Sequence, residues 1–313
     1  MRVLFVCDGG PQVGGGHVMR CLTLAGALTD AGADCAFLDS HAVTPVLDAF
    51  APFEVMRVAD AAAWPSGWVV LDSYRSTLEE EAGWRAASRL AVVDDLARPH
   101  AADLVIDPSF GRDPAAYAPA VALTGPAHAL VRSDFADRRE QALIRRDGEV
   151  QRALIAFGLT DVGGITATAL ERIIPLAGPV TLDVVAGSGA PSLPTLRGLA
   201  ASGIIDLHVD VRDMATLSAA ADIAVGAGGG SIWERATLGL PSIVIALADN
   251  QIPMTRALDA AGVLLESDLE NLGGAWARLT ADAELRASLS AKSAALCDGQ
   301  GARRAAQALL AAG

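Results

Sequence analysis

Short apolar runs and longer amphipathic runs alternate along the first half of the chain. Apolar runs of strand length predict strands at residues 2–7, 34–38, 54–58, 68–71, 90–93 and 104–106. Apolar side chains that recur at three- and four-residue spacing predict helices at residues 18–31, 44–50 and 77–88. Strands that alternate with helices are typical of a parallel sheet covered on both faces, so we expect an α/β fold.

A charged segment, residues 132–148, separates this pattern from a second one of the same kind. The second pattern predicts strands at residues 153–157, 180–185, 204–208, 223–225, 242–245 and 263–265, and C-terminal helices at residues 269–279, 281–297 and 302–312. A chain of 313 residues is long for one domain. We therefore expect two Rossmann-like domains, residues 1–145 and 146–313, with the last helix packing back on the first. Their ligand is expected at the carboxyl ends of the strands, facing a central cleft.

The composition excludes several classes of partner. The net charge of −13 argues against a broad surface for nucleic acid or for an anionic membrane. The chain starts directly with a predicted strand and has no apolar run long enough to span a bilayer, so we expect a cytoplasmic protein. Lys292 is the only lysine, which excludes a Walker lysine. No histidine lies at metal-ligand spacing, so no metal is expected, and His41, His100, His128 and His208 are expected at the surface or as satisfied core residues.

A run of glycines at residues 14–16 joins the first predicted strand to the first predicted helix. Backbone N–H groups at such a junction bind anions, and we expect Gly15 and Gly16 to approach the ligand closely. His17 follows in the first helical turn, where the helix dipole favours a neutral imidazole that takes a proton from water. Arg20, one turn later, is expected to contact a phosphate or to pair with Asp8. This pattern indicates hydrolysis or group transfer on a phosphorylated substrate.

The same glycines raise the alternative of a dinucleotide site. Asp39 follows the second predicted strand at the spacing where such sites carry an acidic residue. The dinucleotide fingerprint requires G-x-G-x-x-G, whereas these glycines are consecutive, and His17 and Arg20 occupy the start of the helix. We therefore expect neither a nicotinamide nor any other cofactor.

A second glycine run, residues 228–230, also lies between a predicted strand and a helix. Ser231 and Glu234 have the spacing of a capping box, which is the purely structural interpretation. The three preceding glycines leave room for a phosphate, and Glu234 then lies where it accepts hydrogen bonds from ribose hydroxyls. Asn250 and Gln251 follow the next predicted strand, and their amides are expected to reach a sugar.

Taken together, the segments at residues 14–22, 228–234 and 250–251 resemble the UDP-sugar hydrolases of the pseudaminic acid pathway. Residues 72–74, 93–96 and 129–135 also look like segments of that family. The resemblance spans most of the chain and implies the GT-B architecture, which the family shares with the N-acetylglucosaminyltransferase of peptidoglycan synthesis. It implies hydrolysis of UDP-2,4-diacetamido-2,4,6-trideoxy-β-L-altropyranose to UDP and the free sugar, without a metal.

The resemblance also implies roles for individual residues. His17 orients or deprotonates the water that attacks the anomeric carbon. The implied substrate contacts are Gly229, Gly230 and Ser231 to the diphosphate, Glu234 to the ribose, Asn250 and Gln251 to the sugar, and Tyr74 and Asp95 from the opposing wall. Two segments depart from the family pattern: residues 158–161 read Gly-Leu-Thr-Asp in place of Gly-Gly-x-Asp, and residues 6–8 lack the arginine of Arg-x-Asp. These departures leave open a different sugar or a weaker contact to the same one.

Some alternatives stay open at this level. Asp94 and Asp95 are adjacent at a strand end, so only one of them is expected to enter a given site. Tyr74 is either a ligand or a loop residue packed on its neighbours. The expected partner is a small-molecule UDP-sugar, with no nucleic acid and no membrane. The main hypothesis is a hydrolase. The alternatives are a GT-B glycosyltransferase that uses an acceptor alcohol and a non-catalytic nucleotide-sugar-binding paralogue, because one scaffold hosts all of these.

Overall fold

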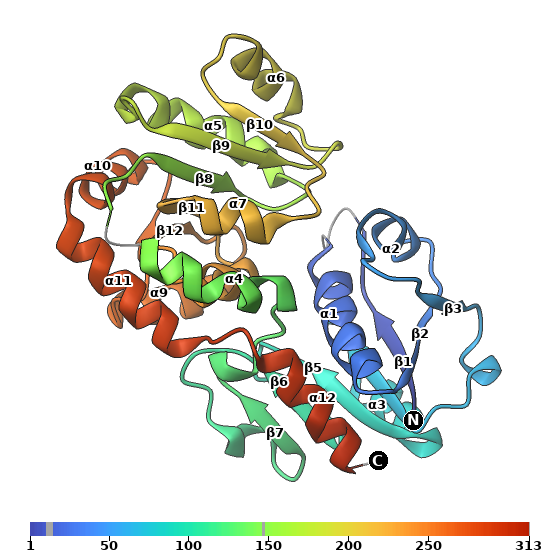
Figure 1. The fold of residues 1–313 in the computed structure, drawn as a ribbon. Helices are drawn as coiled ribbons and strands as arrows, with labels where there is room; N and C mark the ends of the chain where they lie inside the picture. Colours follow the sequence, from blue (N-terminus) through green and yellow to red (C-terminus); the bar gives the residue numbers. More distant parts are fainter. Residues whose placement is uncertain (11–14, 146–147, 313) are drawn as a thin grey trace. The chain divides into compact units, whose positions relative to one another are not determined.

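The computed structural model describes residues 1–10, 15–145 and 148–312. The chain divides into two compact units. Unit 1 comprises Met1–Ser133 and the C-terminal segment from Gly299 onward, and unit 2 comprises Asp134–Asp298 (Figure 1). Gly14 of the first glycine run and residues 146–147 of the charged segment lie outside the described residues.

In its described residues, unit 1 is built on a seven-stranded sheet with the order β3-β2-β1-β4-β5-β6-β7, and every neighbouring pair is parallel. Its strands are β1 Arg2–Cys7, β2 Asp34–Leu38, β3 Met56–Val58, β4 Trp68–Asp72, β5 Arg89–Val93, β6 Leu104–Asp107 and β7 Val121–Thr124. Its helices include α1 Gly16–Asp30, α2 Thr44–Phe50, α3 Leu78–Ala87 and α12 Gly301–Ala312.

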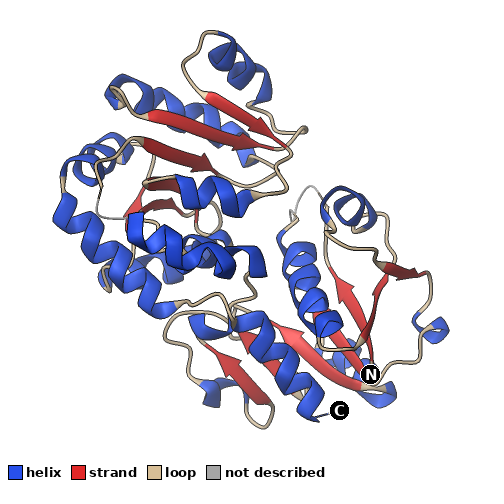
Figure 2. Ribbon diagram, in the orientation of Figure 1, coloured by secondary structure: helices blue, strands red, loops and turns tan. Residues whose placement is uncertain are grey.

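Unit 2 has a six-stranded sheet in its described residues, in the order β10-β9-β8-β11-β12-β13, again with parallel neighbours throughout (Figure 2). Its strands are β8 Arg152–Ala156, β9 Thr181–Ala186, β10 Asp206–Val209, β11 Ile223–Ala227, β12 Ser242–Ile245 and β13 Leu265–Ser267. Its helices include α4 Ser133–Ile144, α5 Ile165–Ile173, α6 Leu193–Ala201, α7 Met214–Ala220, α8 Ser231–Thr237, α9 Ile252–Ala260, α10 Leu272–Ala281 and α11 Ala283–Leu296. The predicted α/β class is confirmed, with one doubly wound sheet in each unit.

The apolar strands form because both faces of each sheet are covered. Successive side chains of a strand point to opposite faces. In β1, Val3 and Phe5 pack in one core cluster, together with residues of α1 and α12. Leu4, between them, packs in a second cluster on the other face, which includes Val92 and Tyr117. Strands buried on both faces read as continuous apolar runs, which is why they are visible in the sequence.

The division of the chain differs from the expected boundary at residues 145 and 146. Helix α4 precedes that boundary, yet all of it after Ser133 belongs to unit 2. One reason is Arg139, whose guanidinium donates hydrogen bonds to the carbonyl oxygens of Thr237 at 2.5 Å, Ala294 at 2.7 Å and Cys297 at 3.0 Å. At the other end of the chain, α12 contributes Leu309 and its neighbours to the core of unit 1.

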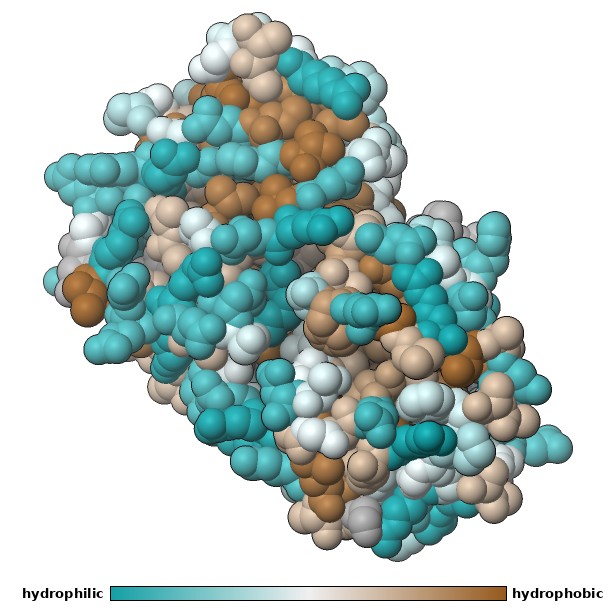
Figure 3. Space-filling view, turned by 45° about the vertical axis from the view of Figure 1, so that its right-hand side comes forward, coloured by the Kyte–Doolittle hydropathy of each residue, from teal (hydrophilic) through white to brown (hydrophobic). Residues whose placement is uncertain are grey.

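The surface is mostly hydrophilic on the face drawn in Figure 3, with several separate hydrophobic areas. The most exposed large apolar side chains come from different elements, for example Val121 at 61% exposure and Ile144 at 74%. None of the described helices combines the length and the apolar character needed to cross a membrane.

Candidate functional site

Each of the two predicted glycine runs follows a central strand of the sheet in its own unit. In unit 1 the strand order reverses between β1 and β4, and in unit 2 it reverses between β8 and β11. Ligands of doubly wound sheets bind outside the carboxyl ends of the strands at this point of reversal. The chain leaves β1 toward α1, which carries His17, and leaves β11 toward α8, which carries Ser231 and Glu234. The sequence motifs therefore lie where this topology places ligands.

A short contact between His17 and Asp72 is central to the site in unit 1. His17 is the second residue of α1, and Asp72 is the last residue of β4, which pairs with Cys7 at the end of β1. The His17 Nδ1 atom lies 2.5 Å from Asp72 Oδ1, and the two residues are 5% and 0% exposed. Because an ionised carboxylate only accepts hydrogen bonds, Nδ1 carries the hydrogen. A neutral imidazole in this tautomer has its lone pair on Nε2, which is the atom that can accept a proton.

Arg20 holds Asp72 from the other side. Its Nε and Nη2 atoms donate to the two carboxylate oxygens at 2.5 and 2.6 Å, and its Nη1 donates to Asp95 Oδ2 at 3.2 Å. Burial raises the pKa of Asp72, but the charge and hydrogen bonds of Arg20, with a further bond from His17, outweigh it and lower the pKa. Asp72 is therefore ionised. The expected alternative pairing of Arg20 with Asp8 is wrong, because Asp8 instead accepts from Ser73 and Arg75 at 2.7 Å each.

Tyr74 and Asp95 complete this group, which we call the Asp72 cluster (His17, Arg20, Asp72, Tyr74 and Asp95). The Tyr74 hydroxyl lies 2.7 and 2.8 Å from the two carboxylate oxygens of Asp95. Its ring meets the His17 ring edge-on, with 4.6 Å between centroids. Burial is the main cause of a raised pKa of Tyr74, so the phenol stays protonated and donates to Asp95. The imidazole is thus fixed both by a carboxylate and by an aromatic ring.

Asp94 and Asp95 point in different directions, as predicted for adjacent residues. Asp94 is fully buried behind the cluster, where Arg98 Nε donates to its Oδ1 at 2.9 Å. Arg98 also donates to the Tyr74 carbonyl oxygen at 3.1 Å. His100 lies in the same network, with its Nδ1 2.9 Å from Glu81 Oε1 and its Nε2 3.6 Å from Asp94 Oδ2. His100 is therefore a buried core histidine whose Nδ1 is paired, but its Nε2 has no hydrogen-bond partner among the described residues, so the expectation of a fully satisfied core residue is wrong for this atom. The network ties the backbone of Tyr74 to buried charges.

In unit 2 the glycine segment, residues 228–231, connects β11 to α8. A Cβ on Gly228 would lie 2.8 Å from Thr255 Oγ1 and 3.1 Å from Gln251 Oε1, so a larger residue there would displace these side chains. Gln251 Oε1 accepts a hydrogen bond from the Leu247 N–H at 2.9 Å. The structure thus places Gln251 beside the glycine segment, as the predicted site requires, and the neighbouring Asn250 is exposed on the same turn.

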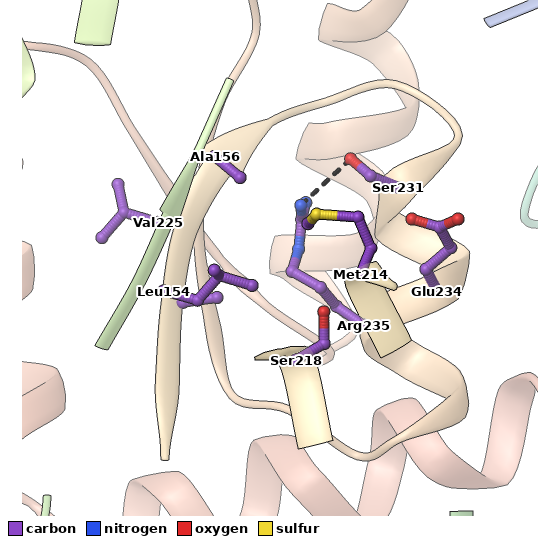
Figure 4. A pocket seen from close by; sticks show the side chains of 9 residues that line it. Leu154, Ala156, Met214, Ser218, Val225, Ser231, Glu234 and Arg235 are labelled. Carbon is purple, nitrogen blue, oxygen red and sulfur yellow. Dashed lines mark hydrogen bonds between the residues drawn. The ribbon is translucent and has the colours of Figure 1, made fainter. Parts of the chain in front are cut away.

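The capping box that was the structural alternative for Ser231 and Glu234 is not formed. The N-cap of α8 is Gly230, with no hydrogen bond from a capping side chain. Ser231 Oγ instead accepts a hydrogen bond from Arg235 Nη1 at 3.0 Å, which Figure 4 shows within a small cavity also lined by Met214 and Glu234. Ser231 and Glu234 are only partly buried, so both side chains have exposed surface at the start of α8.

Two residues were missed at the level of the sequence. Asp72 lies in one of the segments that carry the family resemblance, but its contact with His17 forms only because β1 and β4 are neighbours, which brings residues 17 and 72 together. The sequence assigns Arg235 no role, whereas in the structure it is 5% exposed and donates a hydrogen bond to Ser231. A charged residue immediately after a predicted binding residue was the only available signal. Among residues 1–10, 15–145 and 148–312, no three His, Cys, Asp or Glu side chains are grouped to hold a metal ion.

Comparison with known proteins gives two sequence relatives and no matching family model. The spore coat polysaccharide biosynthesis protein SpsG of Bacillus subtilis (strain 168) is 25% identical over 186 residues, which cover 56% of this chain and 54% of SpsG. The uncharacterized protein MJ1062 of Methanocaldococcus jannaschii is 26% identical over 126 residues, or 39% of this chain and 26% of that protein. The chain thus spans about half of one relative and about a quarter of the other.

Solved structures are similar over nearly the whole chain. Acinetobacter baumannii MurG has a TM-score of 0.66 with 15% identity, and 99% of both chains is covered. S. aureus MnaA, solved with UDP, has a TM-score of 0.66 with 14% identity over 97% of this chain and 95% of MnaA. The spinosyn rhamnosyltransferase SpnG, solved with thymidine diphosphate, has a TM-score of 0.66 with 16% identity over 98% of this chain and all of SpnG. With its two parallel α/β sheets, this protein has the GT-B fold.

Proposed function

We propose that this protein acts on a UDP-linked sugar, breaks the bond between the anomeric carbon and the diphosphate, and passes the sugar to an acceptor. The observation that carries the proposal is the 2.5 Å contact between His17 Nδ1 and Asp72 Oδ1 at the carboxyl ends of β1 and β4. A base oriented by a buried carboxylate is the arrangement that activates a hydroxyl group for attack. Neighbours of the same fold solved with UDP or thymidine diphosphate support a nucleotide ligand.

In the proposed step, His17 Nε2 removes the proton from the acceptor oxygen as that oxygen bonds to the anomeric carbon. The bond from the anomeric carbon to the β-phosphate oxygen breaks, and its electron pair leaves with UDP. Asp72 stabilises the imidazolium that forms. Gly229, Gly230 and Ser231 hold the diphosphate, Glu234 holds the ribose, and Asn250 and Gln251 contact the sugar. In unit 1, Gly15, Gly16 and Arg20 approach the substrate together with Tyr74 and Asp95.

We propose an alcohol as the acceptor, and hence a glycosyltransferase, because the comparisons favour it over water. SpnG is a rhamnosyltransferase, and SpsG is named for polysaccharide biosynthesis. Hydrolysis, with water as the acceptor, is the second candidate. It is supported by the motif resemblance to the UDP-sugar hydrolases, which implies that Tyr74 and Asp95 contact the substrate. Tyr74 packs edge-on against His17 and donates a hydrogen bond to Asp95. The same base serves both reactions, so the acceptor alone separates them.

The test is UDP release from UDP-2,4-diacetamido-2,4,6-trideoxy-β-L-altropyranose and from UDP-GlcNAc, each with and without a panel of sugar alcohols. Release that requires an alcohol, with a glycosylated product, supports the transferase. Release of stoichiometric UDP and free sugar in water alone supports the hydrolase. No release under any condition, with UDP still bound, would contradict catalysis and favour a nucleotide-sugar-binding protein.

A further inference from the structure

Arg235 is a buried cation directly behind the glycine segment of unit 2. It is 5% exposed. Its Nη2 donates to the carbonyl oxygen of Ala227 at 2.9 Å and its Nη1 to Ser231 Oγ at 3.0 Å, while its Nε has no hydrogen-bond partner in the structure. Ala227 and Ser231 are the residues on either side of the three glycines, so one guanidinium holds both ends of the segment.

Buried charges are rare in proteins unless they have a charged partner. The two acceptors of Arg235, a carbonyl and a hydroxyl, are both neutral. Burial lowers the pKa of Arg235 to about 10, an effect that Glu234 partly opposes. The guanidinium is therefore still charged near pH 7, and it contributes positive potential at the segment that it holds.

The backbone around Arg235 is shaped to admit it. A Cβ on Gly226 would lie 2.9 Å from Arg235 Nη1 and 2.5 Å from the Ala156 carbonyl oxygen, so glycine is required beside the guanidinium. Figure 4 shows the side chain extending along α8 toward Ser231, with Met214 of α7 next to it. The cavity there measures about 20 Å³, which is room for about one water molecule and not for a nucleotide. Arg235 can therefore act on a ligand only through the segment and through its charge.

We propose that Arg235 is a positioning residue that orients the Ser231 hydroxyl and supplies the fixed positive charge with which the glycine segment holds a diphosphate. The inference rests on the proposed function, since it assumes that an anionic leaving group binds at this segment. This role explains why the buried position carries an arginine, because a neutral side chain of similar length would fill the same space without supplying a charge. It also explains how a chain with a net charge of −13 binds an anion at this point.

A purely structural role makes a different prediction. If Arg235 only cross-linked the segment, its loss would weaken every ligand of unit 2 to the same degree. If its charge and the orientation of Ser231 serve to bind a diphosphate, replacing Arg235 weakens the affinity for UDP and leaves the affinity for uridine unchanged. Comparing ligands that differ only in phosphate therefore separates the two roles.

The experiment measures affinities of UDP, UMP and uridine for the full chain by calorimetry, with competition for the weak ligands. Arg235→Met removes the charge at similar length, and Arg235→Lys restores the charge without the two-pronged geometry. Arg286→Met is the matched control, because Arg286 is 6% exposed, lies in unit 2 and donates to the carbonyl oxygens of Leu279 and Thr280. We expect Arg235→Met to weaken UDP about 10- to 100-fold and uridine less than about twofold, with partial recovery in Arg235→Lys. Arg286→Met should leave all three affinities unchanged.

Equal losses for UDP and uridine, or no loss for UDP in either Arg235 variant, would overturn the inference while leaving the proposed function intact. If the wild type binds no uridine nucleotide, the proposed function fails, and inorganic pyrophosphate becomes the probe. Thermal stabilisation by pyrophosphate that disappears in Arg235→Met would still support the role of Arg235. Pyrophosphate stabilisation that is absent from the wild type, or kept in Arg235→Met, would overturn it.

Discussion

Asp72 in unit 1 and Asp183 in unit 2 are both buried aspartates that hold one arginine and one histidine. Asp183 accepts from Arg152 Nε and Nη2 at 2.9 and 2.8 Å and lies 2.8 Å from His208 Nε2. We call this group the Asp183 cluster (Arg152, Asp183, Asp206 and His208). By residue type alone, the two clusters are nearly equivalent.

Their positions in the sheets are opposite. Arg152 and Asp206 are the first residues of β8 and β10, so the Asp183 cluster lies toward the amino ends of the strands. Asp72 is the last residue of β4, at the carboxyl ends where doubly wound sheets bind ligands. The two clusters have nearly the same residue types but lie at different ends of the strands. The position of a His-Asp-Arg group on the sheet, rather than its composition, therefore indicates whether it is a ligand-binding site or a structural ion-pair network.

The largest expected effect is the difference in turnover between a variant of His17 and the matching variant of His208. His17→Asn should lower the turnover of UDP-sugar about 10²- to 10⁴-fold, the usual contribution of a general base, because Nε2 is lost as a proton acceptor. UDP affinity should change less than about twofold, since the proposed UDP contacts lie in unit 2. Steady-state kinetics and calorimetry on His17→Asn and His208→Asn provide the measurement. His208→Asn should leave turnover unchanged, and a loss as large as that of His17→Asn would break the comparison.

The two aspartates should give the next largest effect. Asp72→Asn removes the charge that stabilises the imidazolium and allows the other tautomer of His17, so kcat should fall about 100-fold or more. Asp183→Asn removes an equally buried partner from Arg152 and should lower the melting temperature without changing kcat. Melting curves and kcat for both variants check this. Similar kcat values in both variants would show that Asp72, like Asp183, serves only stability.

The smallest expected effect is a pH dependence of the free energy of unfolding, and its source is His100, which lies behind the Asp72 cluster. Burial disfavours the charged form of His100, but the nearby carboxylates of Asp94 and Glu81 raise its pKa to about 9. A raised folded-state pKa means that the stabilisation is fully present below about pH 6.5 and is lost as the pH rises through about 9. Urea unfolding from pH 6 to 10 should therefore show a decline in the wild type that is smaller in His100→Gln. The exposed His41, changed to Gln, is the control, and an unaltered decline in His100→Gln would rule out this source.

The sequence predicted the central strands of the two sheets well because these strands are buried on both faces. The strand β7 was missed, since it is a short edge strand and Val121 is 61% exposed. The strand expected at residues 263–265 instead runs from Leu265 to Ser267, where polar residues replace the apolar run. Edge strands with one covered face lack the continuous apolar pattern that identifies central ones.

The candidate site was predicted only as far as local motifs extend. The glycine runs, His17 and Gln251 were visible because each lies at the end of a predicted strand or the start of a helix. The pairing of His17 with Asp72 depends on β1 and β4 being neighbours, and that strand order is set by tertiary packing. The capping-box alternative for Ser231 and Glu234 fails because α8 is capped by Gly230, and the Ser231 hydroxyl accepts a hydrogen bond from Arg235 instead.

The most direct measurement is a single-turnover assay of UDP release by the wild type and by His17→Asn, with UDP affinity determined on the same samples. The assay uses the UDP-sugar, and the acceptor if one is required, that the test under the proposed function identifies. The account predicts UDP release by the wild type, little or none by His17→Asn, and the same UDP affinity for both proteins. Release by His17→Asn at the rate of the wild type, with unchanged UDP affinity, would contradict the assignment of the base to the Asp72 cluster.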